Sequence, residues 1–147
     1  MNNSDIFKIY QMLYWKNPEE IQLEGIRLAK GVKDLSLLIM PPAHVSTWET
    51  CACILSEKSD EELEPYLDKL LEWLQDLNWA GSYTILERLQ KFQGEKLAKP
   101  FLNSVSLAKS ELDTMWLGFL SDLLDNESLK SSMPKEVLDN FFEMDER

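Results

Sequence analysis

The stretch "LEPYLDKLLEWLQDL", residues 63–77, carries a stripe of leucines that decides the fold. Its apolar residues recur three or four positions apart, which is the spacing of one face of an α-helix. They are Leu63, Tyr66, Leu67, Leu70, Leu71, Leu74 and Leu77. Pro65 predicts a bend or a fresh start near the beginning of the stretch, because proline cannot donate a helical backbone hydrogen bond. We therefore predict an amphipathic helix whose leucines face a core.

Two capping boxes precede and support this helix. Ser59-Asp-Glu-Glu62 stands directly before the leucine stripe, and Ser46-Thr-Trp-Glu49 stands about one helix earlier. In such a box the first side chain and the fourth side chain each accept a backbone N–H at the start of a helix. The earlier box predicts a helix that buries Trp48, Cys51, Ala52 and Leu55.

Further stripes of the same period follow on both sides. "NPEE" at residues 17–20 is a helix start, and "DLSLLIM" at 34–40 is a short apolar helix stopped by two prolines. After the turn at Gly81, the residues predicted on apolar stripes are Tyr83, Leu86, Leu89, Phe92, Phe101, Leu102, Val105, Leu112, Met115, Trp116, Phe119, Leu120, Leu123, Leu124, Val137, Leu138, Phe141 and Phe142. Trp15 is also expected in the core. The pattern thus predicts about eight or nine helices and no strand.

The helix starts suggest a repeat. They fall near residues 18, 46, 79 and 111, at a period of roughly 30 residues. Helix pairs at this period are typical of HEAT-like repeats, in which each pair buries its apolar face on the next pair. We predict an all-α fold, a short right-handed α-solenoid of HEAT-like type that forms a single domain over residues 1–147. A compact, irregular helical bundle is the competing architecture.

The charge balance restricts the partners. Acidic residues outnumber basic ones by 26 to 15, for a net charge of −11. Such a chain repels nucleic-acid phosphates and anionic membrane surfaces, and it accelerates encounter with a basic protein. We expect a basic protein partner and neither nucleic acid nor membrane, with solubility alone as the alternative explanation of the charge. The N-terminal stretch "MNNSDIFKIYQ" lacks the pattern of a signal peptide, so we expect a cytoplasmic protein.

Residues suited to catalysis are scarce. His44 is the single histidine, and the two cysteines, Cys51 and Cys53, lie two positions apart, on nearly opposite sides of a helix. No phosphate-binding glycine loop, nucleophile motif or metal-ligand spacing occurs. A dyad of Cys51 and His44 rests only on their proximity in the sequence. We predict a protein that is not an enzyme and that has no metal or cofactor.

A row of acids lies opposite the leucine stripe. Glu64, Asp68, Glu72 and Asp76 are four residues apart, where like charges repel each other by roughly 0.2–0.5 kcal/mol per pair. The row is either a solvated face or a partner-binding surface, with acid catalysis or metal binding as a remote third interpretation. Trp73 and Trp79 lie beside it and either seal the core or anchor a partner, a role for which tryptophan is favoured. The candidate partner-binding residues are therefore Glu64, Asp68, Glu72, Trp73, Asp76 and Trp79.

Two motifs resemble those of a known family. "LLEWLQDLNWAG", residues 70–81, is similar to an EWLQDxNWP-type motif in a family of small bacterial helical proteins of unknown function, although Ala80 replaces the proline. "DTMWLGFLSDLL", residues 113–124, resembles that family's second motif, and the resemblance covers roughly residues 63–125. It implies a HEAT-like helical fold and no known catalytic residues. Some members resemble immunity proteins of bacterial toxin systems.

These observations converge on binding. We expect a non-catalytic domain that binds another protein, and the resemblance suggests an immunity protein that neutralises a basic toxin. A general helical scaffold or regulatory protein is the first alternative. A HEAT-like glycosylase that repairs DNA is a second, but it needs a basic rim, and only residues 88–99 are mildly basic.

Overall fold

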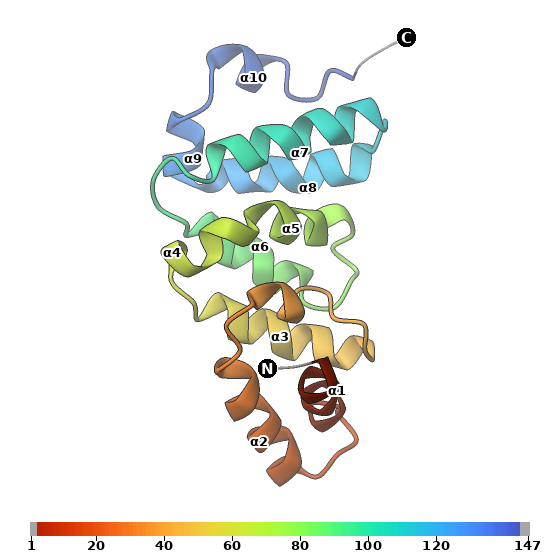
Figure 1. Cartoon of the computed structure of the whole chain (residues 1–147). Helices are drawn as coiled ribbons and strands as arrows, with labels where there is room; N and C mark the ends of the chain where they lie inside the picture. Colours follow the sequence, from red (N-terminus) through yellow and green to blue (C-terminus); the bar gives the residue numbers. More distant parts are fainter. Residues whose placement is uncertain (1–2, 145–147) are drawn as a thin grey trace.

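The computed structural model describes residues 3–144 (Figure 1). Every regular element in this range is an α-helix or a 3₁₀-helix, and none is a strand. This confirms the predicted all-α class. It follows from a sequence rich in apolar residues at helical spacing and poor in residues that break helices.

The helices follow one another from one end of an elongated stack to the other (Figure 1). The first half comprises α1 (Asn3–Met12), α2 (Glu19–Lys30), η1 (Leu35–Leu38), α3 (Val45–Ser56), α4 (Asp60–Leu63), η2 (Glu64–Tyr66), α5 (Leu67–Glu72) and η3 (Trp73–Gln75). The second half comprises α6 (Ser82–Gln90), α7 (Ala98–Ser110), α8 (Thr114–Asp122), η4 (Leu123–Asp125), α9 (Glu127–Ser131) and α10 (Lys135–Asp139). The pair α1 and α2 forms one end of the stack, and α9 with α10 forms the other.

Neighbouring layers pack helix against helix. Helix α1 packs against α2, α3 against both α2 and α6, α5 against α7, and α7 against α8. The helices α3, α6 and α8 all begin on the right-hand side of Figure 1 and run leftward, so their N-terminal ends lie along one side of the stack. Helices α5 and α7 run in the opposite direction.

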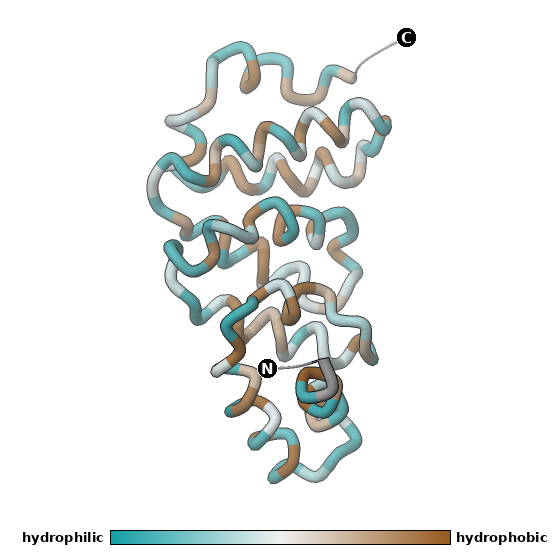
Figure 2. Tube along the Cα trace, in the orientation of Figure 1, coloured by the Kyte–Doolittle hydropathy of each residue, from teal (hydrophilic) through white to brown (hydrophobic). Residues whose placement is uncertain are grey.

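The leucine stripe is the centre of the core, as predicted. All six of its leucines are buried and Tyr66 is half-buried; further large buried side chains come from Phe92, Phe101 and Trp116. Burial of each leucine contributes roughly 1.5–3 kcal/mol to folding. Hydrophobic residues recur along the helices between hydrophilic ones, as Figure 2 shows. The periodicity of the sequence therefore identifies the core correctly in this region.

The helix that carries the stripe is shorter than predicted. Pro65 restarts the chain as the 3₁₀-helix η2, as expected, but the helix also tightens into η3 at Trp73. Asp76 then adopts an extended backbone with φ −144° and ψ 110°. A 3₁₀ turn places side chains at three-residue rather than 3.6-residue intervals, so the acids of this region do not form one straight row.

One predicted capping box is confirmed and the other is wrong. The Ser59 hydroxyl accepts the backbone N–H of Glu62 at 3.1 Å, and the Glu62 carboxylate accepts that of Ser59 at 3.2 Å. Helix α3 instead begins at Val45, where His44 Nδ1 accepts the backbone N–H of Ser46 at 3.1 Å. A histidine with a free ring nitrogen can cap a helix as a hydroxyl does, so the serine two residues later is not needed.

Several residues predicted to be buried are exposed, among them Phe142, which follows α10. Tyr83 and Met115 are the second residues of α6 and α8, and 62% and 54% of their surfaces are accessible. Leu112 lies two residues before α8 and has a positive φ of 55°, and Trp15 follows α1; both are exposed. Ser82 and Trp116, in the same first turns, are fully buried, so Tyr83 and Met115 lie on the side of each turn that no other element covers.

Candidate partner-binding surface

The tryptophan-rich motif at residues 70–81 builds a turn between η3 and α6. Trp73 Nε1 donates a hydrogen bond to the carbonyl oxygen of Ala80 at 2.9 Å. The buried Ser82 hydroxyl lies 2.7 Å from the carbonyl oxygen of Trp73 and 2.9 Å from that of Asp76. Trp73 and Asp76 lie at the end of the helix, where carbonyl groups lack helical partners, and the one hydroxyl proton of Ser82 lies within reach of both. The motif therefore closes a tight connection between two elements of the core.

Gly81 allows the chain to pass through this turn. Its φ is +86°, a left-handed conformation that glycine adopts at little cost. A β-carbon at this position would lie 2.8 Å from Trp73 Cζ2, 2.9 Å from Ala52 Cβ and 3.0 Å from the carbonyl oxygen of Trp48. Glycine is needed for both backbone conformation and space.

Trp73 is not a surface anchor, which corrects the prediction. Its side chain is fully buried, and its ring meets that of Trp48 edge-on at 6.1 Å. Trp73 lies about a quarter-turn away from the leucine stripe, and on that side its ring is covered by Trp48 of α3. Trp79 meets Trp48 edge-on at 6.2 Å and is 37% exposed, so it alone of the two is accessible to a partner.

The predicted acids divide into two groups. Glu64, Asp68 and Glu72 are exposed, and Glu64 forms a long ion pair of 4.0 Å with Lys96. Asp76 is half-buried, and its carboxylate accepts the backbone N–H of Asn78 at 2.8 Å. Asp76 therefore stabilises the turn of the tryptophan motif and is separated from the exposed acids by η3.

Asp68 and Glu72 border a groove between α5 and α7. The groove has a volume of about 230 Å³ and is lined by Asp68, Glu72, Asn103, Ser104, Leu107 and Trp116. Neither carboxylate makes a hydrogen bond or ion pair with any residue between 3 and 144. Leu107 is exposed beside them, whereas Trp116 is buried and donates from Nε1 to the carbonyl oxygen of Leu71 at 3.1 Å. We call this site the acidic groove.

A second accessible surface contains only one residue, Trp79, that the sequence predicts as a partner contact. Val45, Trp79, Tyr83, Leu112 and Met115 are exposed, and each lies in or just before the first turn of α3, α6 or α8. We call this set the apolar edge. Position at a helix start is not a sufficient signal for this surface, because Ile85 and Trp116, in the first turns of α6 and α8, are buried.

The cysteines and the histidine have structural surroundings. Cys51 is fully buried, and this burial raises the pKa of its thiol to about 12. The thiolate is the reactive form of cysteine, so Cys51 has the properties of an inert core residue. His44 is occupied by the cap of α3 and meets the Tyr14 ring edge-on at 5.0 Å.

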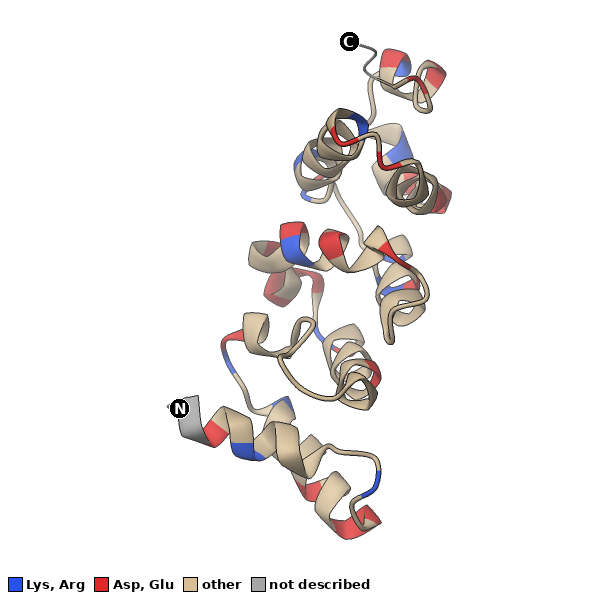
Figure 3. Ribbon diagram, turned by 90° about the vertical axis from the view of Figure 1, so that its right-hand side faces the viewer, with Lys and Arg blue, Asp and Glu red and all other residues tan. Residues whose placement is uncertain are grey.

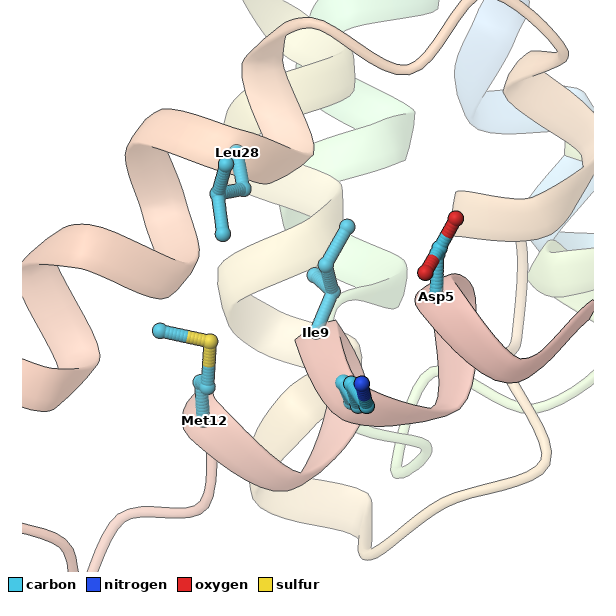
Figure 4. Close-up of a pocket in the computed structure, with 5 residues that line it drawn as sticks. Asp5, Ile9, Met12 and Leu28 are labelled. Carbon is cyan, nitrogen blue, oxygen red and sulfur yellow. The ribbon is translucent and has the colours of Figure 1, made fainter. Parts of the chain in front are cut away.

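Other features give no chemical site. Within residues 3–144, no group of three His, Cys, Asp or Glu side chains could hold a metal ion, and no helix has the length and hydropathy needed to cross a bilayer. A hollow of about 430 Å³ lies between α1 and α2, where Ile9 and Met12 face Leu28 (Figure 4). Asp5 and Lys8 are the charged residues of its lining, and Ile9, Met12 and Leu28 supply the apolar part.

The mildly basic stretch at residues 88–99 is partly neutralised. Arg88 is largely buried and lies 2.5 Å from the Asp60 carboxylate, and it also donates to the carbonyl oxygen of Lys58 at 2.9 Å. The other Asp60 oxygen accepts the backbone N–H of Gln93 at 3.0 Å. Arg88 thus ties α6 to the start of α4, and Lys96 pairs with Glu64.

A known protein family matches most of this chain. Residues 49–144 match a family described as a domain of unknown function, DUF5071. The match extends beyond the 63–125 expected from the two motifs and leaves α1, α2 and η1 outside. No curated protein and no solved structure matches the chain. Because the match covers more than half of its residues, the chain belongs to the DUF5071 family.

Proposed function

We propose that this protein is a non-catalytic domain that binds a basic protein through the acidic groove. The observation that supports the proposal is the pair Asp68 and Glu72, two carboxylates without partners within residues 3–144 that border a groove next to exposed Leu107. A lysine or arginine from a partner would lie between them and be partly shielded from water there. Electrostatic attraction is stronger under such shielding than on an open surface.

The proposed architecture is a short HEAT-like, right-handed solenoid. Two features support it over an irregular bundle. The helices α3, α6 and α8 begin on the same side of the stack (Figure 1), and packing alternates regularly, α3 on α6 and α5 on α7. Repeats of this kind present extended surfaces that suit protein partners.

The charge of the whole chain favours this choice of partner. A net charge of −11 speeds the approach of a basic protein, and this effect weakens as salt is added. Figure 3 shows acidic residues in successive layers of the stack, with basic residues interspersed. Asp68 and Glu72 differ from acids on an open surface because they border the groove between α5 and α7.

The sharper form of the proposal is an immunity protein that neutralises a basic toxin, such as a nuclease. An acidic surface that competes for the contacts of a phosphate backbone would block such a toxin directly. This form rests on the resemblance of the two motifs and on the charge. It predicts a single partner of 1:1 stoichiometry, whereas a general scaffold would bind several partners weakly.

The test is capture of binding proteins from the cells that produce the protein. The immobilised protein is loaded at low salt and eluted at high salt, beside two variants that change the net charge equally. Asp68→Lys with Glu72→Lys reverses the groove, and Glu87→Lys with Asp122→Lys reverses two exposed acids on α6 and α8. We expect one basic protein, eluted by salt, captured by wild type and by the second variant and lost with the first.

Two results would count against the proposal. Equal capture by both variants would show that the acidic groove is not the binding site. Retention of duplex DNA at low salt, in place of a protein, would favour the DNA-repair alternative.

A further inference from the structure

The apolar edge runs along one side of the stack. Val45 begins α3, Trp79 and Tyr83 flank the start of α6, and Leu112 and Met115 flank the start of α8. These three starts lie on the same side in Figure 1. Figure 3, which faces that side, shows mostly uncharged residues around the starts of α3 and α6, and acidic residues in the connection that leads into α8.

Contacts between layers hold the edge together. The edge-on pair of Trp48 and Trp79 joins the start of α3 to the turn before α6. Trp48 is held in turn by its Nε1, which donates to the carbonyl oxygen of Pro41 at 2.7 Å. At α8, the hydrogen bond from Trp116 to Leu71 fixes the first turn against α5. The exposed side chains therefore stand on ordered backbone, which lowers the entropic cost of binding.

The edge is continuous with the acidic groove. Trp116 borders the groove, and Met115, the residue before it, belongs to the edge. Leu112 is likewise next to the exposed Glu111. A partner that covers the edge therefore meets carboxylates along its border, so its complementary surface has an apolar centre and basic flanks.

The spacing of the layers indicates the form of that surface. Packed helices lie about 8–10 Å apart, and an α-helix rises about 10.5 Å over seven residues. Side chains at i and i+7 of a helix laid along the edge would thus face α3 and α6, which pack directly on each other, and later side chains would lie toward α8. Aromatic and methionine side chains are well suited to contact such a helix, because they combine large area with adaptable shape.

We propose that the apolar edge binds an amphipathic helix of the partner, with apolar residues repeating every seven positions and with lysine or arginine at its borders. This rests on the proposed function, since it names the segment with which a basic partner would engage. Trp79, Tyr83 and Met115 are the central contacts. The lysines or arginines of the bound helix reach Asp68 and Glu72.

The test uses three synthetic peptides of about 18 residues, the length of two such repeats and a half. The first has leucines on one face and lysines elsewhere; the second has the same composition with the leucines scattered; the third replaces each lysine with glutamate. Binding is followed by NMR of the methionine methyl groups and tryptophan indoles, and by calorimetry. The first peptide should shift the signals of Met115 and Trp79 and leave buried Met133 and Trp73 unchanged.

Variants locate the contact. Tyr83→Ser with Met115→Ser should weaken binding of the first peptide by at least about tenfold. The control, Leu23→Ser with Phe142→Ser, removes two exposed apolar residues on α2 and after α10 and should change it by less than about twofold. The scattered and the glutamate peptides should each bind at least about tenfold more weakly than the first.

The outcomes separate this inference from the proposed function. If the scattered peptide binds as tightly as the first and the edge variant binds normally, the apolar edge is not a docking surface, while binding of basic partners stands. If the glutamate peptide binds equally well, the prediction that the partner helix has basic borders is wrong. If neither lysine peptide binds, the inference and the proposed function both fail.

Discussion

Gly81 has a positive φ and leaves no room for a β-carbon. Alanine substitutions at Gly81 and at Gly94 separate these two effects. Gly81→Ala should lower the free energy of unfolding by about 3 kcal/mol or more, because strain is added to a clash with Trp73, Ala52 and the Trp48 backbone. Gly94 has nearly the same φ, +85°, but a β-carbon there would meet no atom within 4 Å, so Gly94→Ala should cost only about 1–2 kcal/mol. Urea unfolding of both variants gives the comparison. Equal losses would mean that the turn around Gly81 opens without cost.

Asn126 offers a second residue with a defined structural role. Its buried amide donates to the carbonyl oxygens of Leu89 at 2.9 Å and Phe92 at 2.7 Å, and its oxygen accepts the Leu129 N–H at 3.0 Å. Asn126→Ala should therefore cost about 2–4 kcal/mol of unfolding free energy, since it leaves buried groups without partners. Exposed Asn103 is the control, for which alanine should change stability by less than about 0.5 kcal/mol. Similar effects of the two substitutions would contradict the role of Asn126.

At the residue scale, the sequence shows which residues are important but not which of their side chains are exposed. The motif at residues 70–81 predicts that Trp73 is important, but its spacing leaves open whether the ring packs inward or outward. The answer depends on Trp48 of α3, which is distant in sequence and whose ring meets that of Trp73 edge-on. Asp76 is similar: its position in the acidic row suggests a surface role, but its carboxylate closes a turn.

At the scale of the element, the capping box of α4 makes stability depend on pH. The backbone N–H of Ser59, and next its hydroxyl, lower the pKa of Glu62 below its ordinary value of 4.5. The charged form is thus favoured in the folded state. The charged Glu62 carboxylate therefore stabilises the folded state above its ordinary pKa, and this stabilisation is lost as the pH falls through the lowered pKa of the folded state.

The substitution Glu62→Gln removes this dependence while keeping an acceptor for the cap. The variant should be less stable than wild type at pH 7, and the difference should shrink as the pH falls to 3. Unfolding in urea at pH 7, 5 and 3 measures this. Glu61→Gln is the control, because Glu61 lies next to Glu62 but takes no part in the box. A difference that stays constant with pH would rule out the proposed linkage.

The sequence predicts helix boundaries correctly where they depend only on neighbouring residues. Pro65 and the Ser59 box act on their own neighbours, and both are where the sequence places them. The start of α3 at Val45 and the 3₁₀ turn at Trp73 are different, because they depend on a histidine cap and on the buried turn to α6. The first turns of α6 and α8 each have a buried side, with Ser82 and Trp116, and an accessible side, with Tyr83 and Met115, and which side is covered depends on the neighbouring elements.

At the scale of the whole molecule, composition and periodicity predict an all-α chain with its core in the leucine stripe. They also predict the acidic surface, and Glu64, Asp68 and Glu72 are exposed as expected. They do not predict the groove, because it forms between α5 and α7, which are brought together only by the fold. The apolar edge is likewise a product of three helices whose starts lie side by side.

The charge of the molecule gives a prediction about association. The rate at which a basic partner binds should fall steeply as salt is raised from about 20 to about 500 mM, while the dissociation rate changes less. Stopped-flow or surface-based kinetics on the captured partner would measure both. An association rate that does not respond to salt would mean that the net charge of −11 does not steer the encounter.

Whether the acidic groove binds a partner is decided by the dissociation constant of the captured basic protein for wild type and for the two charge-reversal variants. Asp68→Lys with Glu72→Lys should weaken binding by at least about tenfold, since it places like charges against the partner's basic residues. Glu87→Lys with Asp122→Lys, with the same net charge, should weaken it by less than about threefold. Equal weakening by both variants would show that only net charge matters, and would contradict a specific role for the acidic groove.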